Sequence, residues 1–169
     1  MRGKNQPVVG QIFYVPLYEG GYTFGYVTLI DKQCSTMCNL FDPVSDVSDM
    51  SENLFSCPIV LRDMLVSGAE FSRLRDMADR QWKLTPHHMS DVVHPDVALF
   101  IMRSRPVYQL IDLANGRSKR PATEEEIARY PVLSTKFPPF TTKIVEKAVR
   151  HLDIDAKLIG ADRAEGTVH

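Results

Sequence analysis

The stretch from Gly10 to Ile30, GQIFYVPLYEGGYTFGYVTLI, constrains the fold more than any other part of the chain. Its two arms, Gln11–Leu17 and Tyr22–Ile30, contain many β-branched and aromatic residues, and Glu19-Gly20-Gly21 lies between them. Glycines supply the positive φ that a tight hairpin turn needs. The stretch therefore predicts a β-hairpin, and Gly25 in the second arm predicts a bulge or a close backbone approach.

This hairpin carries more tyrosines than one hairpin easily buries with every hydroxyl group paired. They are Tyr14, Tyr18, Tyr22 and Tyr26. Most residues of the hairpin are expected to form core, but aromatic residues with a polar group are also enriched in protein interfaces. Because Tyr18 and Tyr22 flank the turn, we expect these two to be the most exposed and to offer a recognition surface.

Length and composition are those of one ordinary globular domain. The 169 residues are 44% hydrophobic and 24% charged, with a net charge of −1. The near-neutral charge argues against broad nucleic-acid binding. No apolar run has the length of a signal peptide or a membrane span, so a cytoplasmic location away from the membrane is expected. We expect a flexible tail over residues 1–9, a single domain over 10–152 and a partly mobile extension over 153–169.

The cysteines indicate reduced thiols, because their number is odd. They are Cys34, Cys38 and Cys57. If residues 33–41 form a strand, Cys34 and Cys38 share one face, but no second pair completes a zinc-binding pattern. Free cysteines most often act as small buried hydrophobic residues. We therefore expect neither a metal nor a cofactor at these positions.

The segment from Phe41 to Glu52, FDPVSDVSDMSE, contains acidic residues and no basic one. The acids are Asp42, Asp46, Asp49 and Glu52. Asp-Pro and the serines favour a loop or the start of a helix. The segment is either a solvated loop or an acidic patch that speeds encounter with a basic partner. Its spacing does not fit the ligand pattern of a calcium loop.

The segment from Thr85 to Pro95, TPHHMSDVVHP, has two prolines and is predicted to be a loop. It contains His87, His88 and His94, with Asp91 among them and Asp96 close by. Surface histidines are the simpler interpretation, because no pair of histidines has the helical spacing of a metal site. The alternative is a small metal- or ligand-dependent enzyme or binder that uses this loop.

Further strands are predicted from short apolar runs. They are residues 33–41, Cys57–Val66, a short strand from Trp82, Val97–Arg103 and Val107–Leu113. The last two flank Ser104-Arg105-Pro106 and should pair antiparallel. The sequence predicts an α+β fold, mostly β, in which a bent antiparallel, barrel-like sheet is joined by a short capped helix and a C-terminal helix.

Helices are predicted at three places. Ala69–Ala78 has apolar residues at helical spacing. Thr123 followed by Glu126 forms a capping box, and that helix should stop before Pro131. A C-terminal helix, capped by Thr141 or Thr142, should pack an apolar stripe on the sheet. The stripe comprises Ile144, Val145, Ala148, Val149 and Leu152.

Several of these segments occur in the order and spacing of a known family. GQIFYVPLYEGGYTFGYV resembles the opening of the immunity protein 26 family of bacterial polymorphic toxin systems. Residues 80–83 resemble its Arg-Trp-Lys strand, with Gln81 inserted, and residues 120–126 resemble its Ala-Thr-x-Glu-Glu segment. The final helix falls where the family has one, whereas residues 69–79 and 85–95 do not align.

The resemblance implies a mostly β immunity protein that binds a cognate toxin effector domain in the bacterial cytoplasm and blocks it without catalysis. It would need no cofactor. The residues expected to bind the toxin are the aromatic anchors Tyr18, Tyr22 and Trp82 and the acidic residues Asp42, Asp46, Asp49 and Glu52. A nucleic-acid-binding small barrel is a third class, disfavoured by the net charge and by the lack of a basic, aromatic-rich stripe.

Overall fold

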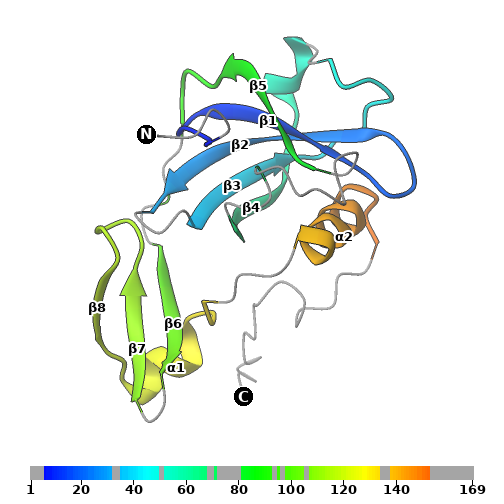
Figure 1. Ribbon diagram of the computed structural model, residues 1–169. Coiled ribbons are helices and arrows are strands. Elements are labelled where there is room, and N and C mark those ends of the chain that lie inside the picture. The colour runs from blue at the N-terminus through cyan, green and yellow to red at the C-terminus, as the bar shows by residue number, and fades with distance from the viewer. Residues whose placement is uncertain are drawn as a thin grey trace. The chain divides into compact units, whose positions relative to one another are not determined.

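The computed structural model describes residues 6–31, 35–49, 52–67, 71, 81–92, 95, 98–104, 107–133 and 138–152 (Figure 1). The sequence predicted a single domain, and the described residues form two compact units. One contains residues 6–92 and 138–152, and the other contains residues 95–133. The chain thus leaves the first unit, builds a second one and returns to the first for its last helix.

The first unit is built on a five-stranded antiparallel sheet with the order β4-β3-β2-β1-β5. Its strands are β1 (Gln11–Pro16), β2 (Tyr22–Ile30), β3 (Ser35–Phe41), β4 (Ile59–Ser67) and β5 (Lys83–His88). The α+β, mostly β prediction is confirmed. The barrel-like part needs correction, because β4 and β5 end the order at opposite edges and the sheet does not close.

The predicted hairpin is confirmed as β1 and β2, which pair from Ile12 with Tyr26 to Pro16 with Tyr22. The turn places Gly20 and Gly21 at φ of +91° and +81°, where a residue with a Cβ is strained. A Cβ at position 25 would lie 2.6 Å from Asn39 O and 2.6 Å from Phe13 Cζ. The close approach predicted at Gly25 is therefore confirmed.

Both faces of this sheet bury side chains, mainly from β1, β2 and β3, whose successive residues point to opposite sides. One face packs against α2 (Pro138–Val149) and the other against the short 3₁₀ helix η1 (Glu52–Ser56), as Figure 1 shows. The core on the α2 side comprises Phe13, Val15, Leu17, Val27, Cys38, Leu40, Val66, Phe71, Trp82, Val145 and Val149. The core on the η1 side comprises Ile12, Phe24, Tyr26, Phe41 and Leu54.

The second unit is a three-stranded antiparallel sheet with one short helix. Its elements are β6 (Leu99–Ser104), β7 (Val107–Asp112), β8 (Ser118–Pro121) and α1 (Glu124–Arg129). The antiparallel pairing of β6 with β7 and the capping box of Thr123 and Glu126 are confirmed. The sequence did not predict β8, because its four residues are all exposed and carry no apolar alternation.

The predictions for α2 are partly wrong. The helix begins at Pro138, three residues before Thr141, because proline is tolerated in the first turn of a helix. Thr141 and Thr142 are buried inside the helix and do not cap it. Leu152 lies beyond the helix and is exposed, so it is not part of the apolar stripe. Apart from Phe71, the predicted helix over 69–78 lies outside the described residues, as do residues 1–5 of the tail and the extension over 153–169.

Candidate interaction surface

The turn between β1 and β2 places two of the predicted anchors at the end of the sheet. Tyr18 and Tyr22 are both half-buried. Leu17 N–H donates to Gly21 O at 3.0 Å, which closes the turn. The ring of Tyr22 meets the ring of Tyr14 edge to face, with centroids 5.6 Å apart. By contrast, Tyr26 is buried, and its hydroxyl oxygen accepts from Asn39 Nδ2 at 2.9 Å.

The acidic segment that follows β3 lies directly against this turn. Tyr22 N–H donates to Ser45 O at 2.7 Å, and Ser45 N–H donates back to Tyr22 O at 2.7 Å. A Cβ at Gly21 would lie 2.9 Å from Val44 Cγ1, so the bare glycine allows the segment to come this close. The structure therefore brings Tyr22 together with residues 42–49. We call residues 18–22 and 42–49 the hairpin-end surface.

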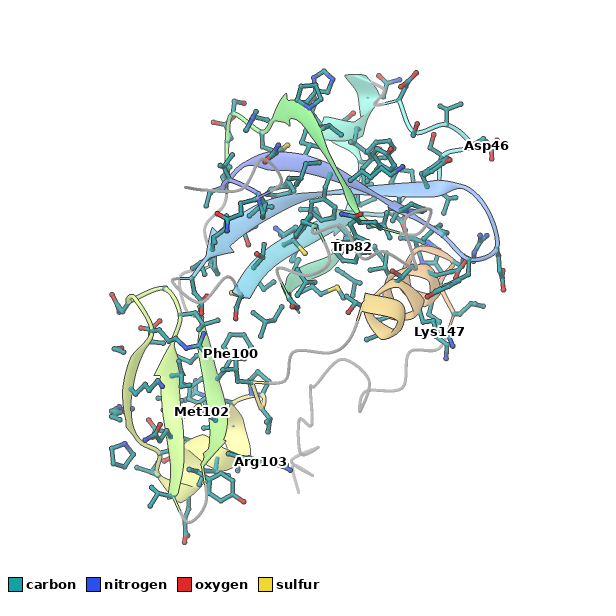
Figure 2. All side chains as sticks on the ribbon, viewed as in Figure 1. Asp46, Trp82, Phe100, Met102, Arg103 and Lys147 are labelled. Atoms are coloured by element: carbon teal, nitrogen blue, oxygen red, sulfur yellow. The ribbon has the colours of Figure 1, made fainter. Side chains whose placement is uncertain are left out.

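The four predicted acids do not share one environment. Asp46 and Asp49 are exposed, and Figure 2 shows Asp46 at the periphery of its unit. Asp42 is half-buried, and its Oδ1 lies 2.9 Å from Nε2 of His151. Glu52 begins η1, and its side chain is outside the description. Among the described side chains, the exposed acids of the surface are Glu19, Asp46 and Asp49, and Glu19 Oε2 lies 3.5 Å from Arg150 Nε.

Exposed apolar side chains accompany these acids, and their exposure was not predicted from the sequence. Val44, Val47 and, in η1, Phe55 are exposed, with Val47 at 59%. Ser45 orders this stretch, because its Oγ donates to Val47 O at 2.9 Å. The sequence pattern that could have indicated this patch is the presence of Val44 and Val47 among aspartates in one loop. Apolar groups surrounded by carboxylates resemble a binding patch more closely than a purely solvated loop does.

Trp82 is a core residue, which corrects its prediction as an anchor. It is 1% exposed, and its ring stacks on Phe13 with centroids 5.2 Å apart and an interplanar angle of 10°. Its Nε1–H donates to Thr142 Oγ1 at 3.0 Å, so its polar group is also satisfied inside the unit. Figure 2 shows Trp82 between the sheet and α2. A partner could not reach this ring without opening the core.

The histidines of the alternative site are placed differently from the prediction. His87 and His88 are exposed on strand β5, which takes up the first part of the predicted loop. As consecutive strand residues, their side chains point to opposite faces. Asp91 is exposed, and His94 and Asp96 lie outside the described residues. In the described part of the chain, no group of three His, Cys, Asp or Glu residues could hold a metal ion.

Two cysteines are described, and both are free thiols. Cys38 is buried in β3, and its Sγ lies 3.6 Å from Met64 O. Cys57 is half-buried after η1, with its Sγ 3.4 Å from Asn53 O. Cys34 lies outside the described residues, so its predicted position on the same face as Cys38 is not tested. Each described thiol therefore lies beside a backbone carbonyl oxygen of its own unit.

The one carboxyl group with a strongly shifted pKa belongs to the cap of α1, within the described part of the chain. Glu126 accepts from Arg120 and from the Thr123 backbone N–H, and these bonds lower its pKa to about 2. The same pairing raises the pKa of Arg120. Both groups fix the start of a helix in the second unit. The shift is therefore explained by a structural ion pair and a capping box.

The chain matches no protein-family model, no curated protein and no solved structure. Within the described ranges, no helix is both long enough and apolar enough to cross a membrane. The hairpin-end surface offers tyrosine rings, valines and exposed carboxylates, and these groups can bind a basic protein surface.

Proposed function

We propose that this protein is a non-catalytic immunity protein, which binds a cognate toxin effector domain in the bacterial cytoplasm and neutralises it by occlusion. The family resemblance of the sequence supplies the immunity role. The observation that carries a binding role is the reciprocal hydrogen bonding of Tyr22 and Ser45, which joins the turn and the acidic segment into one surface. Two segments fixed together present a more ordered target than two independent loops, which lowers the entropic cost of binding.

The chemistry of this surface favours a basic partner. Tyr18 and Tyr22 supply aromatic area with a polar group, and Val47 supplies an exposed apolar contact. Asp46 and Asp49 add two exposed negative charges beside them. Charges at the edge of an interface raise the association rate and discriminate between partners. A toxin that acts on nucleic acid would carry the positive charge that matches them.

The proposal is tested by co-expressing the C-terminal toxin domain encoded by the neighbouring upstream gene. The expected result is restored growth together with a complex that survives purification. Catalytically inactive toxin should form the same complex, because occlusion requires binding and not turnover. Folded proteins that neither rescue growth nor co-purify would refute the proposal for that toxin. A catalytic activity of the purified protein that is lost on substituting His87 or His88 would instead favour the alternative enzyme class.

A further inference from the structure

Residues at the C-terminal end of α2 and just after it contact both segments of the hairpin-end surface. Glu146 is 8% exposed, and its Oε1 accepts from Glu19 N–H at 2.7 Å. Arg150 Nη2 donates to Gly20 O at 3.0 Å. The Arg150 Nε also lies 3.5 Å from Glu146 Oε1 and 3.5 Å from Glu19 Oε2. The hairpin turn is therefore held by one buried carboxylate and one guanidinium group.

His151 holds the other segment. Its Nε2 lies 2.9 Å from Asp42 Oδ1 at the start of the acidic segment. The backbone of His151 has a φ of +53°, and Leu152 N–H donates to Lys147 O at 2.8 Å just after the helix end. Glycine is the usual residue in this left-handed position. A histidine here is strained, and its imidazole lies against Asp42.

We propose that Glu146, Arg150 and His151 form a clamp that positions the hairpin turn and the acidic segment relative to each other. These three are positioning residues, and the clamp orders the surface in the free protein before any partner binds. The clamp itself is a property of the protein alone. Its value for toxin recognition rests on the proposed function, because ordering a surface in advance raises affinity only if that surface binds.

The clamp is tested by amide hydrogen exchange of the free, full-length protein. Glu146→Ala removes the acceptor of Glu19 N–H, so exchange of this amide should become about tenfold faster. Glu146→Gln retains a side-chain oxygen and should restore most of the protection. Lys143→Ala, at an exposed position of the same helix, is the matched control and should change nothing. Core amides of β3 report global stability.

A second variant keeps the test decisive if Glu146→Ala does not fold. His151→Gly keeps the left-handed backbone and removes the imidazole, and should speed exchange of Ser45 N–H about two- to fivefold, as expected for a contact between largely exposed polar side chains. Unchanged exchange at Glu19 or Ser45 in these variants, or equal acceleration of the β3 amides, would overturn the clamp. Since no toxin is present, failure of the immunity proposal would leave this result unaffected.

Discussion

The cluster of Trp82, Phe13 and Phe71 and the hairpin-end surface are both rich in aromatic rings. The rings of the cluster are buried, whereas Tyr18 and Tyr22 of the surface are partly exposed. Trp82 is enclosed by Phe13, Phe71 and α2, and its N–H is satisfied by Thr142. Tyr22 is only partly buried, against Tyr14 and the segment around Ser45. The difference shows that an aromatic residue becomes core or surface according to which distant segments return to cover it. Substitutions in the two regions should therefore have different consequences.

The largest loss of stability is expected for a substitution in the cluster around Trp82. Trp82→Ala should lower the free energy of unfolding by about 3–5 kcal/mol, because it empties a large buried site and leaves Thr142 Oγ1 without its donor. Tyr22→Ala should cost only about 1 kcal/mol, since its ring is only partly buried. Urea denaturation of both variants measures the contrast. Similar losses would contradict the division into core and surface.

Gly25→Ala should be next in size and should disturb the same cluster. The new Cβ would lie 2.6 Å from both Asn39 O and Phe13 Cζ, and Phe13 stacks on Trp82. We expect a loss of about 3 kcal/mol from overpacking. Gly20→Ala is the matched control, because its Cβ would have open space and only the positive φ would cost about 1 kcal/mol. Fluorescence of Trp82, the only tryptophan, should change in the first variant alone.

The helix cap in the second unit should respond to acid. The pKa of Glu126 is lowered to about 2 from an ordinary 4.5, mainly by Arg120. A lowered carboxyl pKa contributes stability above the unfolded value, and this contribution is lost as pH falls from about 4.5 through about 2. NMR titration should place the Glu126 midpoint near the lower value. A midpoint near 4.5, or no shift on substituting Arg120 by Met, would contradict the ion pair.

The smallest effect on folding is expected at the exposed acids. Asp46→Lys combined with Asp49→Lys should change the unfolding free energy by less than about 0.5 kcal/mol. Association with the co-purified toxin domain should become about tenfold slower at low salt, and the difference should shrink at high salt. Glu124→Lys with Glu125→Lys, exposed on α1, is the matched control. Equal rates for both charge reversals would remove Asp46 and Asp49 from the interface.

Local patterns were sufficient to predict the elements whose causes lie close in sequence. The β1–β2 hairpin follows from its glycines, and the cap of α1 follows from Thr123 and Glu126. The start of α2 was missed because threonine fits both a cap and a helix interior. The helix instead begins with two prolines, which are tolerated in a first turn. Strand β8 was missed because its register comes from pairing with β7 and not from its own exposed residues.

The composition of the hairpin-end surface was only half predictable. Tyr22 and the acidic segment were proposed separately, and nothing local indicates that Tyr22 pairs with Ser45, which follows the neighbouring strand β3. Asp42 had the same appearance in the sequence as Asp46, yet its carboxyl group lies against His151, more than a hundred residues further along the chain. Trp82 was assigned to the surface because its covering residues, Phe71 and Thr142, come from other elements. Long-range contacts decided each of these outcomes.

The most direct test of the proposed surface compares two exposed valines. Val47 and Val107 are 59% and 50% exposed, one on the hairpin-end surface and one in the second unit. Affinity for the co-purified toxin domain should be measured by calorimetry for Val47→Arg and Val107→Arg. We predict at least about a tenfold loss for the first, since it places a bulky charge in the contact, and an unchanged affinity for the second. Unchanged binding by Val47→Arg, or an equal loss in both variants, would contradict the assignment of the interface to the hairpin-end surface.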